Sequence, residues 1–119
     1  MYIDKLCQQQ ERKYRNKKVE YNGMLFDSKK ELKRYQELLI LLRAGEIDNL
    51  QRQITYELLP AFTKHKKKYR NICYVADFQY TDKAGNVIVE DVKGMRTDVY
   101  LMKKKMFEYM YKNLIIKEL

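Results

Sequence analysis

The chain has 119 residues, 45% of them hydrophobic, and its 25 lysines and arginines against 16 aspartates and glutamates give a formal net charge of +9. This length suits a single domain, and the hydrophobic content excludes a disordered chain. No apolar run approaches the roughly 18 residues that a membrane span needs. The basic balance favours a polyanionic partner, nucleic acid first and an anionic membrane surface second.

The N-terminal segment is polar and ends in a basic run over residues 12–18. We interpret residues 1–18 as a solvated basic arm, with phosphate contact as the alternative, and residues 19–119 as one folded domain. The segment lacks the hydrophobic region of a signal peptide, and Cys7 and Cys73 lack Cys-x-x-Cys spacing. This usage predicts a reduced, intracellular protein and argues against a zinc site.

A short hairpin and a helix are predicted next. Residues 19–21 and 24–26 flank an Asn-Gly turn, and Ser28 with Glu31 forms a capping box for a helix that ends near Gly45. The expected apolar stripe of this helix consists of Leu32, Tyr35, Leu38, Leu39 and Leu42. Glu31 lies at the head of that stripe. It serves either as the cap alone or as a carboxylate offered to a site beside the sheet.

A strand is predicted within residues 47–59, ended by Pro60. Gln51 and Gln53 precede its clearest part on one face and would either touch DNA or fill the surface. The basic stretch 64–70 is predicted to be a connecting loop. Its candidate nucleic-acid contacts are Lys64, Lys66, Lys67, Lys68 and Arg70. A solvated charge run and a phosphate-binding loop both remain open for it.

Two apolar, β-branched runs flank residues 82–86, which predicts a β-hairpin with Gly85 in a left-handed conformation. In that register Asp77 lies directly opposite Asp91, and strand alternation places Lys93 on the same face. Two opposed carboxylates are destabilising unless something neutralises them, and oxygen ligands suit Mg²⁺ or Mn²⁺. The alternative is a set of ordinary exposed strand charges with Lys93 as the counter-ion.

The C-terminal part is predicted to contain a helix over residues 98–112, capped by Thr97, and a last short strand at 114–116. We expect the apolar stripe of this helix to face the core. Its members are Val99, Met102, Met106, Tyr109 and Met110. Lys103 shares the side of Val99 and Met106, and we add it to the candidate phosphate contacts.

The resulting order is helix, three strands, helix and strand. Together with the acids Glu31, Asp77 and Asp91 and with Lys93, it resembles the PD-(D/E)XK nuclease superfamily, and more narrowly its short bacteriophage-type endonuclease family. The pattern Phe-Asp-Ser-Lys-x-Glu opens the first helix, and an Ala-Asp-Phe strand precedes a Glu-Asp-Val-Lys-Gly strand. The resemblance covers about residues 13–116.

The sequence departs from the superfamily's pattern at two positions. Ala76 stands where the superfamily's name has proline, a change that leaves the neighbouring carboxylate in place. Glu90 offers an alternative second acid. Because alternation puts Glu90 on the face opposite Lys93, we predict Asp91 as the second acid and a charge on the other face or in an interface as the role of Glu90.

The resemblance implies an α/β, restriction-endonuclease-like αβββαβ core with a central mixed sheet flanked by helices. It also implies Mg²⁺- or Mn²⁺-dependent hydrolysis of DNA phosphodiesters. Asp77 and Asp91 would hold the metal, with Glu31 as a direct or water-mediated ligand. Lys93 would orient the attacking water or neutralise charge on the phosphate. The implied setting is phage DNA recombination or processing in the cytoplasm of a bacterial host cell, without a membrane partner.

The small size leaves little surface for base readout, which favours branched DNA, such as a Holliday junction, and a homodimer that cuts two strands. The main alternative is a non-catalytic, basic nucleic-acid-binding protein on the same scaffold. A second alternative is an RNA-associated or adaptor protein, which would need aromatic stacking platforms on an exposed sheet face.

Overall fold

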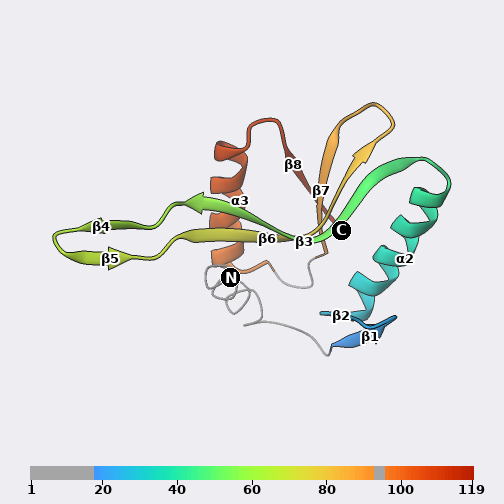
Figure 1. Cartoon of the computed structure of the whole chain (residues 1–119), viewed down its shortest axis with the longest axis horizontal. Coiled ribbons are helices and arrows are strands. Elements are labelled where there is room, and N and C mark those ends of the chain that lie inside the picture. The colour runs from blue at the N-terminus through green and yellow to red at the C-terminus, as the bar shows by residue number, and fades with distance from the viewer. Residues whose placement is uncertain (1–17, 93–95) are drawn as a thin grey trace.

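The computed structural model describes residues 18–92 and 96–119. In chain order, the elements are β1 (Val19–Tyr21), β2 (Met24–Phe26), α2 (Lys29–Arg43), β3 (Ile47–Leu59), β4 (Phe62–Lys64), β5 (Lys67–Tyr69), β6 (Ile72–Asp82), β7 (Val87–Asp91), α3 (Asp98–Met110) and β8 (Ile115–Glu118). The central sheet has the order β3-β6-β7-β8, with β8 parallel to β7 and the other pairs antiparallel. The predicted mixed α/β architecture is therefore confirmed, and the predicted helices and strands follow in the expected order, with β4 and β5 as two additional strands (Figure 1).

The ends of α2 follow local sequence signals. The Oγ atom of Ser28 accepts a hydrogen bond from the backbone N–H of Glu31 over 3.1 Å. The Glu31 side chain closes the cap one residue earlier than in a standard capping box, because its Oε1 accepts the N–H of Asp27 at 2.9 Å. At the other end, Gly45 has φ of 77°, and its N–H donates to the carbonyl of Leu42.

The β6–β7 hairpin has the predicted register. Phe78 lies opposite Glu90, and Thr81 lies opposite Val87. Gly85 takes φ of 89° in the turn, where a left-handed backbone favours glycine. The turn chemistry therefore determines which side chains of the two strands face each other.

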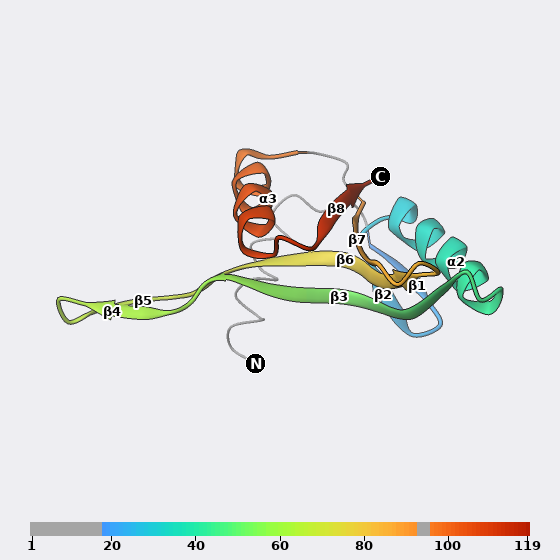
Figure 2. The same ribbon diagram turned by 90° about the horizontal axis from the view of Figure 1, so that it is seen from above.

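Two apolar clusters hold the helices against the sheet. The first joins α3 to the sheet and contains Tyr56, Leu58, Tyr74, Ala76, Val89, Tyr100, Phe107 and Ile116. The second joins α2 to the sheet and contains Leu38, Ile47, Phe78 and Tyr80. The two helices pack at separate places along the sheet, as Figure 2 shows, and strands β6 and β7 carry the candidate acids Asp77 and Asp91.

The buried face of α3 differs from the predicted one. Val99, Met102, Tyr109 and Met110 are exposed and Met106 is partly buried, whereas Tyr100, Lys103 and Phe107 are buried. The physical reason is aromatic packing. The rings of Tyr100 and Phe107 lie 6.3 and 5.5 Å from the ring of Tyr74, and such large rings outweigh methionine in the core. The predicted stripe was therefore wrong.

The basic stretch 64–70 is not a simple connecting loop, which corrects a second prediction. Residues 62–69 form the β4–β5 hairpin, which extends the β3–β6 ribbon away from both helices (Figures 1 and 2). His65 and Lys66 form its two-residue turn, with φ of 51° and 65°. Positive φ at both central positions is the geometry of a type I′ turn, which matches the twist of the flanking strands.

Two further expectations concern the cysteines and membrane-spanning helices. Cys73 is buried and disulfide-bonded, which contradicts the expected free thiol; the other cysteine, Cys7, lies outside the described residues. No helix in the described ranges is long and apolar enough to cross a membrane.

Candidate active site

The carboxylates of Asp77 and Asp91 lie on the same side of the β6–β7 hairpin. The ladder next to them pairs Phe78 with Glu90, and continuing it by one pair sets Asp77 opposite Asp91. Oδ2 of Asp77 accepts the backbone N–H of Val92 over 2.8 Å. Burial raises the pKa of Asp77 well above its usual range, and the nearby Asp91 carboxylate raises it further. The predicted juxtaposition of these two acids is confirmed.

Glu31 reaches the same acids from the first turn of α2. Its side chain is only 2% exposed. Burial raises the pKa of Glu31, while the hydrogen bond from the Asp27 backbone and a hydrogen bond with Asp77 lower it. The negative charge of Glu31 in turn raises the pKa of Asp77. Glu31 therefore both caps the helix and stands beside Asp77, which were the two alternatives for this residue.

Gln53 is a fourth member of this group, whereas the sequence offered only DNA contact or surface filling as its role. The β3–β6 register pairs Arg52 with Phe78 and Ile54 with Ala76, which places Gln53 opposite Asp77. Its Nε2 donates a hydrogen bond to Oε2 of Glu31 over 3.1 Å. The only sequence signal was strand alternation, which assigns Gln53 to one face of β3 but does not identify its partner.

A tyrosine fixes Asp91. The hydroxyl of Tyr74 on β6 donates a hydrogen bond to Oδ2 of Asp91, and the two side chains are buried. Burial raises the pKa of Tyr74, and the charge of Asp91 raises it further. Tyr74 therefore remains a neutral donor to the carboxylate.

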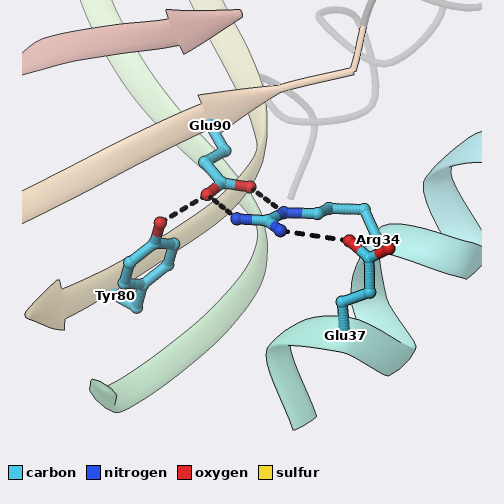
Figure 3. Close-up of polar contacts among 4 residues, drawn as sticks. All are labelled: Arg34, Glu37, Tyr80 and Glu90. Carbon is cyan, nitrogen blue, oxygen red and sulfur yellow. Dashed lines mark hydrogen bonds and ion pairs between the residues drawn. The ribbon is translucent and has the colours of Figure 1, made fainter. Parts of the chain in front are cut away.

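Glu90 belongs to a different network, as Figure 3 shows. It is fully buried, and both of its carboxylate oxygens accept hydrogen bonds from Arg34 of α2, at 2.8 and 2.6 Å. The hydroxyl of Tyr80 donates to the same carboxylate, and Arg34 also contacts Glu37 at 3.1 Å. This bidentate pairing occupies Glu90 structurally, as predicted for a charge in an interface.

The structure places the predicted cationic residues in different environments. Lys93 lies outside the described residues. Lys103 is only 3% exposed on the buried side of α3, so it does not present a surface ammonium for phosphate. The other candidates are exposed at the β4–β5 hairpin: Lys64, Lys66, Lys67, Lys68 and Arg70. Only the acidic half of the predicted constellation is therefore brought together among the described residues.

The donor chemistry of the acids suits Mg²⁺ or Mn²⁺, because Glu31, Asp77 and Asp91 offer oxygen atoms alone. Within residues 18–92 and 96–119, however, no three histidine, cysteine, aspartate or glutamate side chains form a group arranged to hold a metal ion. The carboxylates of Glu31, Asp77 and Asp91 instead accept hydrogen bonds from Gln53, the Val92 backbone and Tyr74, respectively. A cation would fit by donor type and charge after these side chains adjust.

The family model described as a protein of unknown function, DUF1064, matches residues 11–118. The chain belongs to this family. No curated protein and no solved structure matches the chain.

The clustered carboxylates of this DUF1064 domain can respond to their mutual repulsion in two ways. The cluster can retain a proton, since burial and then the charges of Asp91 and Glu31 raise the pKa of Asp77. Alternatively, it can bind a cation, which would remove the repulsion between Asp77 and Asp91. Both behaviours come from carboxylates held on one side of the sheet by Gln53, Tyr74 and the Val92 backbone.

Proposed function

We propose that the chain is a metal-dependent DNA endonuclease of the PD-(D/E)XK type that hydrolyses phosphodiester bonds. Its site residues would be Glu31, Asp77, Asp91 and Lys93. The observation that supports this proposal is that Asp77 and Asp91 face each other on one side of the β6–β7 hairpin, with Glu31 from α2 beside Asp77. Three acids from separate elements in one small region repel one another, and a purely structural role does not account for this electrostatic cost.

The cofactor would be Mg²⁺ or Mn²⁺, held by Asp77 and Asp91 and, directly or through water, by Glu31. Such an ion, when bound, lowers the pKa of a water molecule and stabilises charge on a phosphate. The protein's part is to aim the ligands. Gln53 holds one oxygen of Glu31, the Val92 N–H holds one oxygen of Asp77, and Tyr74 holds one oxygen of Asp91.

Lys93 completes the proposed set through its position in the sequence, two residues after Asp91. We assign it the role that the superfamily resemblance implies. A flexible ammonium group can orient the attacking water or neutralise charge on the phosphate. We therefore expect the Lys93→Ala variant to lose DNA cleavage although Glu31, Asp77 and Asp91 are unchanged.

The substrate is proposed to be DNA, because the chain carries a net charge of +9 and the acids alone would repel a polyanion. A domain of 119 residues favours recognition of shape, such as a branch or a Holliday junction, over a long base sequence. Cutting two strands of a junction would use a homodimer. We place this activity in phage DNA recombination or processing in the bacterial cytoplasm.

The test is a cleavage assay on linear, nicked, flapped and four-way DNA with Mg²⁺ and with Mn²⁺. We expect the wild type to cut branched DNA faster than linear DNA, and Asp77→Asn and Lys93→Ala to lose at least about 100-fold in rate, the scale of a lost acid–base or electrostatic contact. Asp98→Asn is the matched control, because Asp98 is an exposed aspartate of α3. Gel filtration of the same samples measures the dimer.

The proposal fails if wild type and Asp77→Asn bind all four DNAs equally and neither cuts any of them with either metal. That result would leave the non-catalytic nucleic-acid-binding protein. Equal cutting of linear and branched DNA by a strict monomer would instead remove only the junction and dimer parts.

A further inference from the structure

The β4–β5 hairpin, residues 62–69, is a narrow arm that projects from the end of the β3–β6 ribbon. Figures 1 and 2 show it extended away from α2, α3 and the central sheet. Every residue from 60 to 70 is exposed. A two-stranded hairpin without an apolar face is marginal in water, so burial does not explain this arm.

The arm concentrates positive charge. Residues 60–71 contain Lys64, Lys66, Lys67, Lys68 and Arg70 and no aspartate or glutamate. The register sets Lys64 directly opposite Lys67, and like charges opposed across two strands are destabilising. In the described part of the chain, no carboxylate forms an ion pair with the four lysines. The folded arm is therefore suited to an external polyanion.

A pair of aromatic rings stiffens the base of the arm. Phe62 and Tyr69 lie opposite each other with ring centroids 4.7 Å apart and planes within 12°. They remain 43% and 40% exposed, and the ammonium of Lys67 lies 5.0 Å from the Tyr69 ring centre. The arm thus presents a preformed ribbon, which loses less conformational freedom on binding than a loose loop would.

We propose that the β4–β5 arm binds in a groove of duplex DNA beside the scissile phosphate. The proposal deepens the nuclease assignment and rests on it for the substrate class. The major groove, about 12 Å wide, admits a two-stranded β-ribbon. At about 3.3 Å per residue along a strand, Lys66 lies at most about 36 Å from Asp77 along the ribbon. That distance equals about one turn of B-DNA, or about 10 base pairs.

Two consequences separate this arm from a general basic surface. The arm lysines should carry a larger share of binding than equally charged lysines elsewhere. In addition, the protein should require about 10 base pairs of duplex on one side of the cleavage position before the arm contributes, because a shorter flank ends before the arm tip.

The first experiment compares two full-length variants that each lose four positive charges. The arm variant is Lys64→Gln, Lys66→Gln, Lys67→Gln and Lys68→Gln. The matched control changes four exposed lysines elsewhere: Lys33→Gln, Lys105→Gln, Lys112→Gln and Lys117→Gln. Binding to a labelled 24-base-pair duplex is measured by fluorescence anisotropy from 50 to 200 mM KCl. Circular dichroism and thermal unfolding confirm that both variants fold.

We expect the arm variant to bind at least about tenfold more weakly and its salt slope to fall by up to about 3.6, or about 0.9 for each of four lost phosphate contacts, while the control slope falls by less than about 1. Equal losses in the two variants would overturn the proposal. Retained duplex binding by the arm variant, with loss of binding to vesicles that contain phosphatidylserine, would also overturn it and indicate an anionic membrane surface.

The second experiment measures binding to duplexes of 8, 12, 16 and 24 base pairs. We expect the difference between wild type and arm variant to emerge above about 10 base pairs. A difference of the same size at 8 base pairs would overturn the reach argument. Both experiments measure DNA binding in EDTA, without metal. The two proposals can therefore fail separately: absence of cleavage by the wild type would refute the nuclease assignment, but it would not affect the binding result for the arm.

Discussion

Gln53 donates a hydrogen bond from Nε2 to Oε2 of Glu31 over 3.1 Å, and it does so from a left-handed backbone with φ of 52° in the middle of β3. A non-glycine residue in this conformation costs on the order of 1 kcal/mol, and such strain collects at functional sites. The same residue lies opposite Asp77 in the β3–β6 register. We interpret Gln53 as a positioning residue for the acidic site.

The first prediction concerns Gln53→Gly, which removes the amide and relieves the backbone strain. We expect unfolding stability to stay within about 1 kcal/mol of the wild type or to rise, because glycine tolerates positive φ. Cleavage should slow by about tenfold or more in kcat, since the Glu31 carboxylate loses a donor. Kinetics on the preferred DNA and urea unfolding provide the two readings.

Asn49→Gly is the control for this prediction. Asn49 also has a left-handed backbone, with φ of 53°, but it lies nearer the start of β3. The change should relieve similar strain without altering cleavage. If Gln53→Gly instead lowers the free energy of unfolding enough to account for its slower cleavage, Gln53 has only a structural role.

The second prediction concerns the buried pair of Arg34 and Glu90. Removing one partner leaves the other charge or dipole buried and unsatisfied, so Arg34→Met should lower the free energy of unfolding by about 3 kcal/mol. The double variant Arg34→Met with Glu90→Gln should lose less than the two single changes added together. Glu37→Gln is the control, because Glu37 pairs with the same Arg34 at the surface and should cost less than about 1 kcal/mol. Additive losses would contradict the pairing.

The third prediction concerns pH. The pKa of Asp77 in the folded protein is raised above its value in an unfolded chain, by burial first and then by Asp91 and Glu31. The folded state therefore holds the proton more tightly, and stability is highest below the unfolded pKa and falls as pH rises through the raised folded value. Without divalent metal, we expect the contribution of Asp77 to Tm to increase as the pH is lowered from neutrality toward the ordinary range of an aspartate.

Asp77→Asn should flatten that pH profile, because the variant cannot ionise at this position. Mg²⁺ at millimolar concentration should raise the Tm of the wild type at pH 7.5 and leave that of Asp77→Asn nearly unchanged, since a ligand of the folded state stabilises it. An identical Mg²⁺ response in the two proteins would count against a cation at Asp77.

The parts of the fold that the sequence predicts correctly depend on short-range chemistry. Gly85 requires a turn with positive φ, and that turn sets the β6–β7 register and hence the meeting of Asp77 and Asp91. Ser28 likewise starts α2 through a hydrogen bond to a residue three positions away. In these cases the deciding interaction lies within a few residues of the sequence signal.

The parts that the sequence does not predict depend on long-range contacts or on an uncommon backbone. Arg34 and Glu90 are 56 positions apart, so spacing could not pair them. The turn of the β4–β5 arm uses His65 and Lys66 at positive φ, without the glycine or asparagine that normally marks such a turn. The partner of Gln53 also depends on how α2 meets β3, which is a tertiary contact.

The faces of α3 provide the last prediction. Both candidate faces carry apolar side chains at helical spacing, and aromatic packing decides between them. Phe107 is fully buried with its ring 4.9 Å from that of Tyr56, whereas Met102 is 56% exposed. Phe107→Ala should therefore lower the free energy of unfolding by about 3–5 kcal/mol, and Met102→Ala should change it by less than about 0.5 kcal/mol. Urea unfolding measures both, and a larger loss at Met102 would restore the methionine stripe as the buried face.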